Sequence, residues 1–299
     1  MAPSRPAAPL DLPIAYPVFC EPGVRLGLAS IVQQVAPAHR VAIMSDDTVA
    51  AAHGDAVHSQ FDAERSALFT MPPGEQEKTR ARWAALTDDL VAWGAGRDTT
   101  IVALGGGVVC DLAGFVAATY MRGLPVVQVP TTLLAMVDAS VGGKTAVDTP
   151  AGKNLVGAFH NPAAVVIDPD VLGSLPPAIL RSGLAEMLKH GVIADAAYYE
   201  RLLQALPALL AGSSSAASFS STISPLIADS VRIKAAVVAE DEREGGLRQV
   251  LNFGHTIAHA IEKLLNYDML HGDAVAMGMV AEARMAVALG IAPADLAAT

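Results

Sequence analysis

The sequence predicts an α/β fold in which an N-terminal doubly wound, Rossmann-like domain with a mostly parallel sheet precedes an all-α C-terminal domain. Short apolar runs alternate with helix-compatible segments as far as residue 167, which is the pattern of a parallel sheet covered by helices. Three consecutive glycines at residues 105–107 directly follow one apolar run, as expected of a tight turn from strand to helix. From about residue 171 helical spacing dominates. We therefore expect domains at residues 1–170 and 171–299.

The composition excludes several classes of protein. With 299 residues, 52% of them hydrophobic and 17% charged, the chain is long enough for two domains and a sizeable core. A net charge of −10 disfavours nucleic acid as a partner, because nucleic-acid binders usually carry a basic excess. The sequence holds no bilayer-spanning apolar run and no signal-peptide core. Its two cysteines, Cys20 and Cys110, favour a reducing compartment. We expect a soluble, cytoplasmic protein that binds neither membranes nor nucleic acid.

The elements of the first domain are expected in a regular order. Strands are expected at residues 18–20, 40–44, 66–70, 100–104, 126–129 and 163–167. Helices are expected at residues 25–35, from residue 48, at residues 75–93 and after the three glycines. Residues 141–154 interrupt this alternation, and they predict a folded-back hairpin with Pro150 and Gly152 in its turn.

The second domain is expected to be helical throughout. Helical spacing predicts helices at residues 178–190, 198–210, 219–240, 247–264 and 271–289. A Ser-rich run at residues 212–221 predicts a connection between two of them. We expect the active cleft between this domain and the sheet.

The run of Gly105, Gly106 and Gly107 is a candidate nucleotide site. Free N–H groups and the positive end of the helix dipole would point at a ligand above the glycines, which is the physics of a diphosphate cradle. The pattern GGGxxxD, which ends at Asp111, differs from the common G-x-G-x-x-G fingerprint. Taken alone, it fits a tight connection equally well.

Polar residues follow other predicted strands. Asp46 comes after the strand at residues 40–44, where an acid could bind a ribose hydroxyl or simply cap the next helix. Thr131 and Thr132 offer two hydroxyls after a later strand. Glu75 and Lys78 lie one turn apart, so they either form an ordinary helical pair or reach into the crevice at the sheet.

Lysine is scarce in this chain. Only six of the twenty cationic side chains are lysines, namely Lys78, Lys144, Lys153, Lys189, Lys234 and Lys263. Arginine cannot replace lysine where a compact charge or a proton donor is needed. Each lysine is therefore a candidate for a site, with an ordinary surface position as the alternative.

The helical half carries a candidate metal site. Glu186, Lys189 and His190 share a helix face, His255 and His259 lie one turn apart, and His271 begins the last predicted helix. One carboxylate and two imidazoles would leave open positions on a zinc ion, which is a catalytic arrangement. The spacing also fits capping or packed histidines, and it leaves open which of the three histidines bind metal.

Four strings carry a resemblance to a known family. They are GGGVVCDLAGFVAATYMRG, VPTTLLAMVDASVGGKTAVDTPAGKNLVGAF, LAEMLKHG and LNFGHTIAHAIE, the last followed by LHGDAVAMGM. Between about residue 46 and residue 278 the chain resembles the 3-dehydroquinate synthase family, whose superfamily includes other sugar phosphate cyclases and metal-dependent polyol dehydrogenases.

The resemblance implies NAD and one divalent metal ion as cofactors, with zinc the first choice and cobalt the alternative. It implies zinc ligands at Glu186, His255 and His271. It implies contacts to NAD from Asp46, Gly74, Glu75, Lys78, Gly105, Gly106, Gly107, Val108, Asp111, Thr131, Thr132, Lys144, Lys153, Val171, Leu172 and Ser174. Around the substrate it implies Asp138, Lys144, Asn154, Lys189, Lys234, Arg248, Asn252 and His259, together with Arg122 in the neighbouring subunit's site of a homodimer.

The implied activity is that of a carbon–oxygen lyase of the shikimate pathway, which leads to chorismate and the aromatic amino acids. An anionic sugar phosphate, 3-deoxy-D-arabino-heptulosonate 7-phosphate, would become 3-dehydroquinate and phosphate. The steps would be transient oxidation by NAD, β-elimination, re-reduction and intramolecular aldol closure. His259 is the candidate for proton transfer, because its reference pKa of about 6.5 suits work near neutral pH.

Two departures from the family pattern bear on this interpretation. Family members usually continue beyond the position of Thr299 with further helices and a late lysine, so we expect the helical domain to be truncated here. The loop TAVDTPAG carries Ala146 and Asp148 where TGVN is more common. The alternatives are another sugar phosphate cyclase, a metal-dependent polyol dehydrogenase, or a truncated inactive homologue that serves as a binding subunit.

Overall fold

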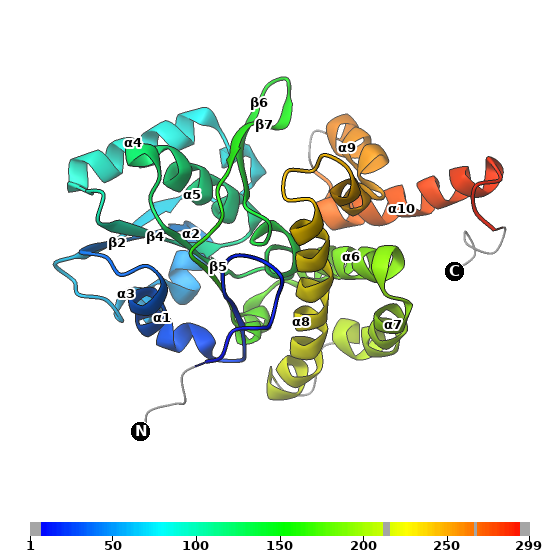
Figure 1. Cartoon of the computed structure of the whole chain (residues 1–299), viewed down its shortest axis with the longest axis horizontal. Helices are drawn as coiled ribbons and strands as arrows, with labels where there is room; N and C mark the ends of the chain where they lie inside the picture. Colours follow the sequence, from blue (N-terminus) through cyan, green and yellow to red (C-terminus); the bar gives the residue numbers. More distant parts are fainter. Residues whose placement is uncertain (1–6, 212–215, 266–267, 294–299) are drawn as a thin grey trace.

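The computed structural model describes residues 7–211, 216–265 and 268–293. A parallel sheet with its covering helices forms one half of the molecule, and a group of helices forms the other (Figure 1). The predicted fold class is therefore confirmed. Within these residues, no helix is both long enough and apolar enough to cross a membrane.

Six strands form the sheet, in the order β1-β8-β5-β4-β2-β3, and all neighbouring pairs are parallel. The order reverses between β2 and β4, which is where an open α/β sheet binds its ligand. The strands are β1 Val18–Cys20, β2 Arg40–Asp46, β3 Ser66–Met71, β4 Thr99–Gly105, β5 Val126–Pro130 and β8 Ala164–Ile167. A separate antiparallel hairpin, β6 Lys144–Thr149 and β7 Gly152–Phe159, confirms the predicted hairpin and extends it to residue 159.

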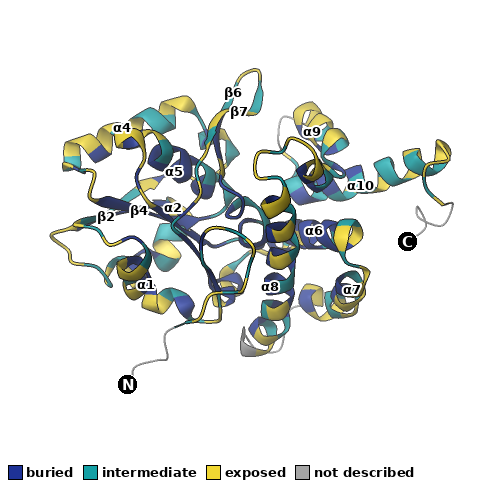
Figure 2. Cartoon of the chain, in the orientation of Figure 1, coloured by how far each residue is buried: buried dark blue, intermediate teal, exposed yellow. Residues whose placement is uncertain are grey.

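Alternate side chains of each strand enter different cores, which explains the buried strands in Figure 2. Ala42 of β2 and Ile101 of β4 pack with α4 (Arg80–Trp93) and α5 (Gly107–Thr119). Ile43 and Val102, the next residues along each strand, pack with α1 (Leu28–Val35) and α3 (Asp55–His58) on the other face. The sheet is thus covered on both faces, as the uninterrupted apolar runs predict.

The helical half consists of longer helices: α6 Pro177–Ala194, α7 Ala196–Ala211, α8 Ala216–Glu240, α9 His255–Leu264 and α10 His271–Ala288. One core joins α6, α7 and α8 to Val165 and Ile167 of β8 and to Val18 of β1. The two halves therefore share a core. The division of the chain into two domains near residue 170 stays a prediction.

Several predicted boundaries are wrong. The single helix expected at residues 75–93 is a 3-10 turn, Glu75–Glu77, followed by α4. Thr79 is extended, and its side chain accepts a hydrogen bond from Arg82 N at 3.1 Å, so the cap sets the start of α4. In contrast, the helix expected from residue 48 is confirmed within one residue: α2 Asp47–Val49 continues without a break through a π-helical stretch, Ala50–Gly54, into α3. The helical start at Thr131 and Thr132 leads to a π turn, Ala135–Ala139.

The helix expected at residues 247–264 is also interrupted. A 3-10 turn, Leu247–Asn252, is separated from α9 by Gly254, whose φ of 82° is left-handed. Gly254 N donates to Glu282 of α10 at 2.7 Å, and a Cβ at Gly254 would lie 2.8 Å from Met279 N. This turn begins α9 at His255. The Ser-rich connection is shorter than expected, because α8 already starts at Ala216, and residues 212–215 lie outside the described residues.

Candidate active site

Glu186, His255 and His271 meet at one point, although they come from three helices, α6, α9 and α10. One ligand atom of each lies within 4.8 Å of those of the other two. Glu186 Oε1 is 3.8 Å from His255 Nε2 and 3.6 Å from His271 Nε2. The structure thus brings the three predicted metal ligands together.

A contact at Nδ1 sets the orientation of each of the two histidine rings. His255 Nδ1 lies 3.3 Å from the carbonyl oxygen of Phe253, and His271 Nδ1 lies 3.2 Å from Glu262 Oε1. A partner that accepts a proton from Nδ1 leaves the lone pair on Nε2. Both Nε2 atoms face Glu186, so the donor set is one carboxylate and two imidazoles with open positions beside them.

The carboxylate of Glu186 fits a cation. It is fully buried, and neither oxygen accepts a hydrogen bond from the described residues, although Lys189 Nζ forms an ion pair with Oε2. Burial opposes the ionisation of Glu186, but Lys189 and His271 outweigh it and hold its pKa well below the usual range. Lys189 pairs with Oε2 only, so Oε1, which faces both histidine Nε2 atoms, is a buried oxygen without a donor, and such an oxygen is rare in proteins and requires a partner. A divalent ion at this point would supply one.

The two histidines are in different protonation states when no ion is bound. Burial and the nearby Lys189 lower the pKa of His255 to about 4, so it is neutral near pH 7. Burial would also lower the pKa of His271, but its contacts with Glu186 and Glu262 raise it to about 9. The proton on His271 Nε2 therefore occupies the position that a metal ion would take, and metal binding would release it.

Further predicted residues surround this cluster. Lys234 Nζ donates to both the side chain and the carbonyl oxygen of Asp138, and Asp138 lies close to Glu186 and His190. Lys189 and Lys234 are buried. The exposed ring of His259 lies 5.5 Å from that of His255, centroid to centroid. Two lysines and an acid thus lie on the Glu186 side of the cluster, and His259 lies beside its histidines.

The glycine turn lies at the carboxyl end of β4, and Gly106 is the N-cap of α5. Gly105, Gly106 and Gly107 all have negative φ, so glycine is needed here for space rather than for a left-handed backbone. A Cβ at Gly105 would lie 2.5 Å from Val109 Cβ, and one at Gly106 would lie 3.1 Å from Thr132. The N–H groups at the start of α5 remain available for an anion.

Other predicted nucleotide residues lie at the same edge of the sheet. Asp46 follows Ser45, which pairs with Leu104 of β4, and its carboxylate accepts from Val49 N at 2.9 Å. The capping interpretation of Asp46 is thus confirmed, and its position beside the glycine turn also fits a ribose contact. Thr131 N donates to Gly105 O at 2.9 Å. Thr132 caps the turn that follows it, and Val171, Leu172 and Ser174 form part of the 3-10 helix Pro169–Ser174 after β8.

A buried lysine links the glycine turn to the hairpin. Lys78 Nζ donates to Asp111 Oδ2 and, at 2.6 Å, to Asn154 Oδ1. Burial would lower the pKa of Lys78, but the negative charges of Asp111 and Glu75 outweigh burial, so the pKa is raised. Lys78 therefore reaches into the crevice rather than forming a surface pair. Asn154, predicted with the substrate, lies in this group.

The loop before the 3-10 turn Leu247–Asn252 contacts three residues predicted at the substrate. Glu244 accepts from Lys144 Nζ at 2.6 Å and from Asn252 Nδ2 at 3.0 Å. Arg248 is 1% exposed, and its guanidinium donates to the carbonyl oxygens of Glu242 and Gly142. Arg248 thus holds the loop against the start of the hairpin.

Lys153 connects the two sides of the site. Its Nζ lies 3.3 Å from Glu75 Oε1, after Gly74 on the sheet side, and 3.2 Å from Glu262 Oε1 on α9. In contrast, Arg122 lies beyond the far end of α5, which places it on the order of 20 Å from the glycine turn, given a rise of about 1.5 Å per residue. The structure does not bring Arg122 to the site of its own chain.

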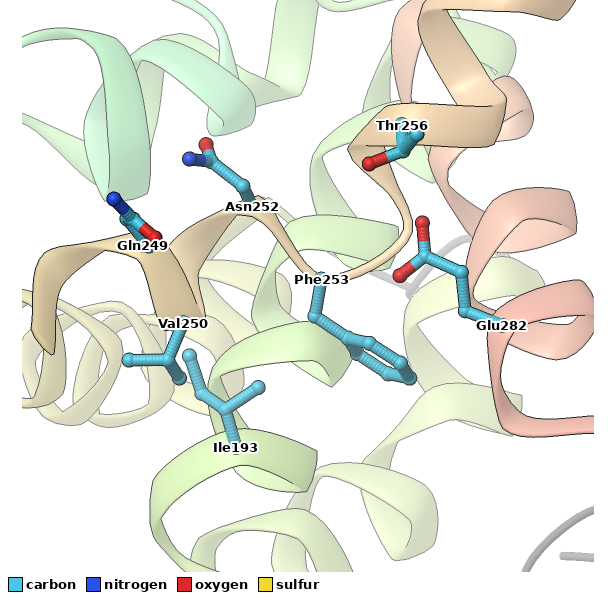
Figure 3. A pocket seen from close by; sticks show the side chains of 7 residues that line it. All are labelled: Ile193, Gln249, Val250, Asn252, Phe253, Thr256 and Glu282. Atoms are coloured by element: carbon cyan, nitrogen blue, oxygen red, sulfur yellow. The ribbon is translucent and has the colours of Figure 1, made fainter. Parts of the chain in front are cut away.

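A pocket of about 580 Å³ lies beside this site (Figure 3). Ile193, Val250 and Phe253 form its apolar wall, and Thr256 and Glu282 point toward it from α9 and α10. Asn252 is the predicted site residue that lines it, and none of the three clustered ligands does. The pocket is therefore adjacent to the cluster of Glu186, His255 and His271 and does not include it.

Two further residues at this site, Glu244 and Glu262, are not among those predicted from the sequence. Glu262 had a usable signal, because His255, His259 and Glu262 follow at intervals of four and three and so share one face of α9. Glu244 had no such signal, since it lies in a loop with a left-handed φ of 60°.

Two family descriptions match the chain. "3-dehydroquinate synthase N-terminal" matches residues 68–182, and "3-dehydroquinate synthase C-terminal" matches residues 183–299. A 3-dehydroquinate synthase of Symbiobacterium thermophilum is 46% identical over 280 residues, which are 93% of this chain and 76% of that relative. The similarity therefore extends over both halves of the molecule.

Two solved structures have a similar fold. A 2-deoxy-scyllo-inosose synthase complexed with carbaglucose-6-phosphate, NAD⁺ and Co²⁺ matches with a TM-score of 0.83 at 28% identity, over 95% of this chain and 76% of that one. ValA, a 2-epi-5-epi-valiolone synthase of Streptomyces hygroscopicus with NAD⁺ and Zn²⁺ bound, matches with a TM-score of 0.83 at 27% identity, over 98% and 80%. The cofactor pair expected from the sequence is the pair that these two proteins bind.

Proposed function

The chain belongs to the 3-dehydroquinate synthase family, and from this membership we propose that it is a lyase. It converts 3-deoxy-D-arabino-heptulosonate 7-phosphate into 3-dehydroquinate and phosphate. Its cofactors are NAD and a divalent metal ion, zinc or cobalt. The observation that carries the proposal is the buried carboxylate of Glu186, which has no hydrogen bond among the described residues and faces two histidine Nε2 atoms. Lys153 ties this cluster to the nucleotide edge of the sheet.

The bound cofactors would supply a Lewis acid at a substrate oxygen and a reversible hydride acceptor. The residues of the chain bind and orient the substrate. Lys189 and Lys234, both buried, place positive charge beside Asp138 and so fix hydroxyl groups near the metal ligands. Lys144, whose side chain is 47% exposed, is available to an anionic group of the substrate. A local cluster of cations thus lets an acidic protein bind an anion.

His259 is proposed to move a proton. Partial desolvation lowers the pKa of this largely exposed ring from its ordinary value, so the ring is neutral near pH 7 and can accept a proton. Its ring stands beside that of His255 but is not one of the three clustered ligands. This position lets His259 reach a substrate atom next to the metal ion.

We further propose that the protein is a cytoplasmic homodimer. Arg122 lies away from the site of its own chain, as required if it serves the site of a neighbour. Strand β7 is a strand of an isolated hairpin and presents Leu155 and Phe159, which are 63% and 51% exposed. An exposed apolar edge strand is a typical surface for association. Sedimentation or light scattering that gives the mass of a monomer would contradict this proposal.

Incubation of the full chain with NAD, Zn²⁺ and the heptulosonate phosphate tests the activity. We expect phosphate and 3-dehydroquinate in equal amounts and no net NADH, because the hydride returns to the substrate. Steady NADH production from a polyol, with no phosphate release, would instead identify a dehydrogenase. Lys189→Ala and His259→Ala should lose turnover while NAD still binds, and unchanged rates in both would contradict their proposed roles.

A further inference from the structure

Glu262 is a buried carboxylate that the proposed reaction does not use. It lies on α9, and its side chain is 2% exposed. Its Oε1 lies 3.2 Å from His271 Nδ1 on α10 and 3.2 Å from Lys153 Nζ on β7. One carboxylate thus joins the consecutive helices α9 and α10 to strand β7, which lies 109 positions earlier in the sequence.

From these contacts, and on the basis of the proposed function, we propose that Glu262 is a positioning residue for the metal ion. A histidine can bind a metal ion through either ring nitrogen, and a hydrogen bond at one nitrogen decides which remains free. Glu262 accepts the Nδ1 proton of His271, so Nε2 is turned toward Glu186. Without this carboxylate the ring could rotate or present the wrong nitrogen.

Lys153 holds Glu262 in place from the other side. Its ammonium group lies between Glu262 and Glu75, so Glu262 Oε1 is fixed by one cation and one imidazole. Glu186 and Glu262 flank His271, and each also forms an ion pair with a lysine, Glu186 with Lys189 and Glu262 with Lys153. A carboxylate that only joined α9 to the hairpin would need the contact with Lys153 but none with a metal ligand.

The test is the Zn²⁺ affinity of the full chain, measured by competition with a chromophoric chelator. Glu262→Gln is expected to bind Zn²⁺ about 10- to 100-fold more weakly than the parent. The matched control is Glu240→Gln, an exposed glutamate at the end of α8, which is expected to bind like the parent. The visible absorption bands of the Co²⁺-loaded protein should also change in Glu262→Gln, because the ligand geometry changes. Equal affinities and equal spectra in Glu262→Gln and parent would overturn the proposal.

A measurement on the parent covers the case in which Glu262→Gln fails to fold. In the Zn²⁺-loaded parent with ¹⁵N-labelled histidine, we expect a slowly exchanging proton on His271 Nδ1 and the metal on Nε2. Metal on Nδ1 would overturn the positioning role. A parent that binds Zn²⁺ no better than Glu186→Gln would contradict the proposed function, and the positioning role with it. A parent that binds Zn²⁺ tightly, with Glu262→Gln unaffected, would contradict the positioning role alone.

Discussion

The buried charged groups on the two sides of the site differ in their hydrogen-bond partners. On the sheet side, Lys78 is 3% exposed, and its ammonium group donates to Asp111 and Asn154. On the helix side, Glu186 is fully buried, and neither of its oxygens accepts a hydrogen bond within the described part of the chain. Lys78 on the sheet side therefore has its hydrogen-bond partners within the chain, whereas Glu186 on the helix side has an ion pair with Lys189 but no hydrogen bond among the described residues.

This difference shows which side depends on a ligand for its stability. A buried polar network whose members are all hydrogen bonded fixes the local structure, while a partly satisfied one is costly. Glu186 keeps its charge because Lys189 and His271 lie beside it, yet its lone pairs remain open. We expect removal of a group on the helix side to act mainly on metal binding and turnover, and removal of a group on the sheet side to act mainly on folding.

The largest expected effect is that of Glu186→Gln, because it removes the charged ligand of the cluster. Turnover should fall by at least about 10³-fold, roughly 4 kcal/mol, since a metal ion contributes several kcal/mol to charge stabilisation. Metal content after dialysis and turnover are the measurements, with Glu200→Gln on the exposed face of α7 as the control. Unchanged metal content would show that the cluster does not hold the ion. The helix side would then not differ from the sheet side in its need for a ligand.

The next effect belongs to the sheet side. Lys78→Met should lower the free energy of unfolding by about 3 kcal/mol, because it leaves the largely buried Asp111 without its cation. Urea denaturation without NAD or metal measures this loss. Lys263→Met, at an exposed lysine of α9, is the control and should change stability little. A loss for Lys78→Met no larger than that of the control would mean that the network is not structural.

The smallest expected effect is a pH dependence on the helix side. His190 is fully buried, its Nδ1 lies 2.7 Å from Ser230 Oγ, and burial lowers its pKa from 6.5 to about 3. Between these values the unfolded chain binds a proton that the folded chain does not, so stability rises with pH. The contribution of neutral His190 is therefore complete above pH 6.5 and is lost as the pH falls toward 3.

Urea unfolding of the metal-free chain at pH 7 and pH 5 measures this dependence. Between these two pH values the parent should lose about 2 kcal/mol more than His190→Gln, at a slope of up to about 1.4 kcal/mol per pH unit. Equal losses in the two proteins would show that His190 is not held neutral by the fold.

The sequence predicted the sheet well because each strand carries its own apolar pattern, as in the runs that became β2 and β4. It failed where a single residue ends a helix. Thr79 and Gly254 each interrupt a helical pattern, and both do so through a specific contact, Thr79 with Arg82 N and Gly254 N with Glu282. The second of these contacts joins residues 28 positions apart, so no local pattern contains it.

The sequence by itself determined the chemical types at the site: the three glycines after β4, the scarce lysines, and the set of Glu186, His255, His259 and His271 in the helical half. Tertiary structure decided that His255 and His271 face Glu186, that each ring turns its Nε2 toward Glu186, and that Glu262 contacts Nδ1 of His271. The physical reason is the distance in the sequence between the residues that interact. Side-chain chemistry and helical spacing are properties of neighbouring residues, whereas the position of Glu186 relative to the two histidines depends on how α6, α9 and α10 pack.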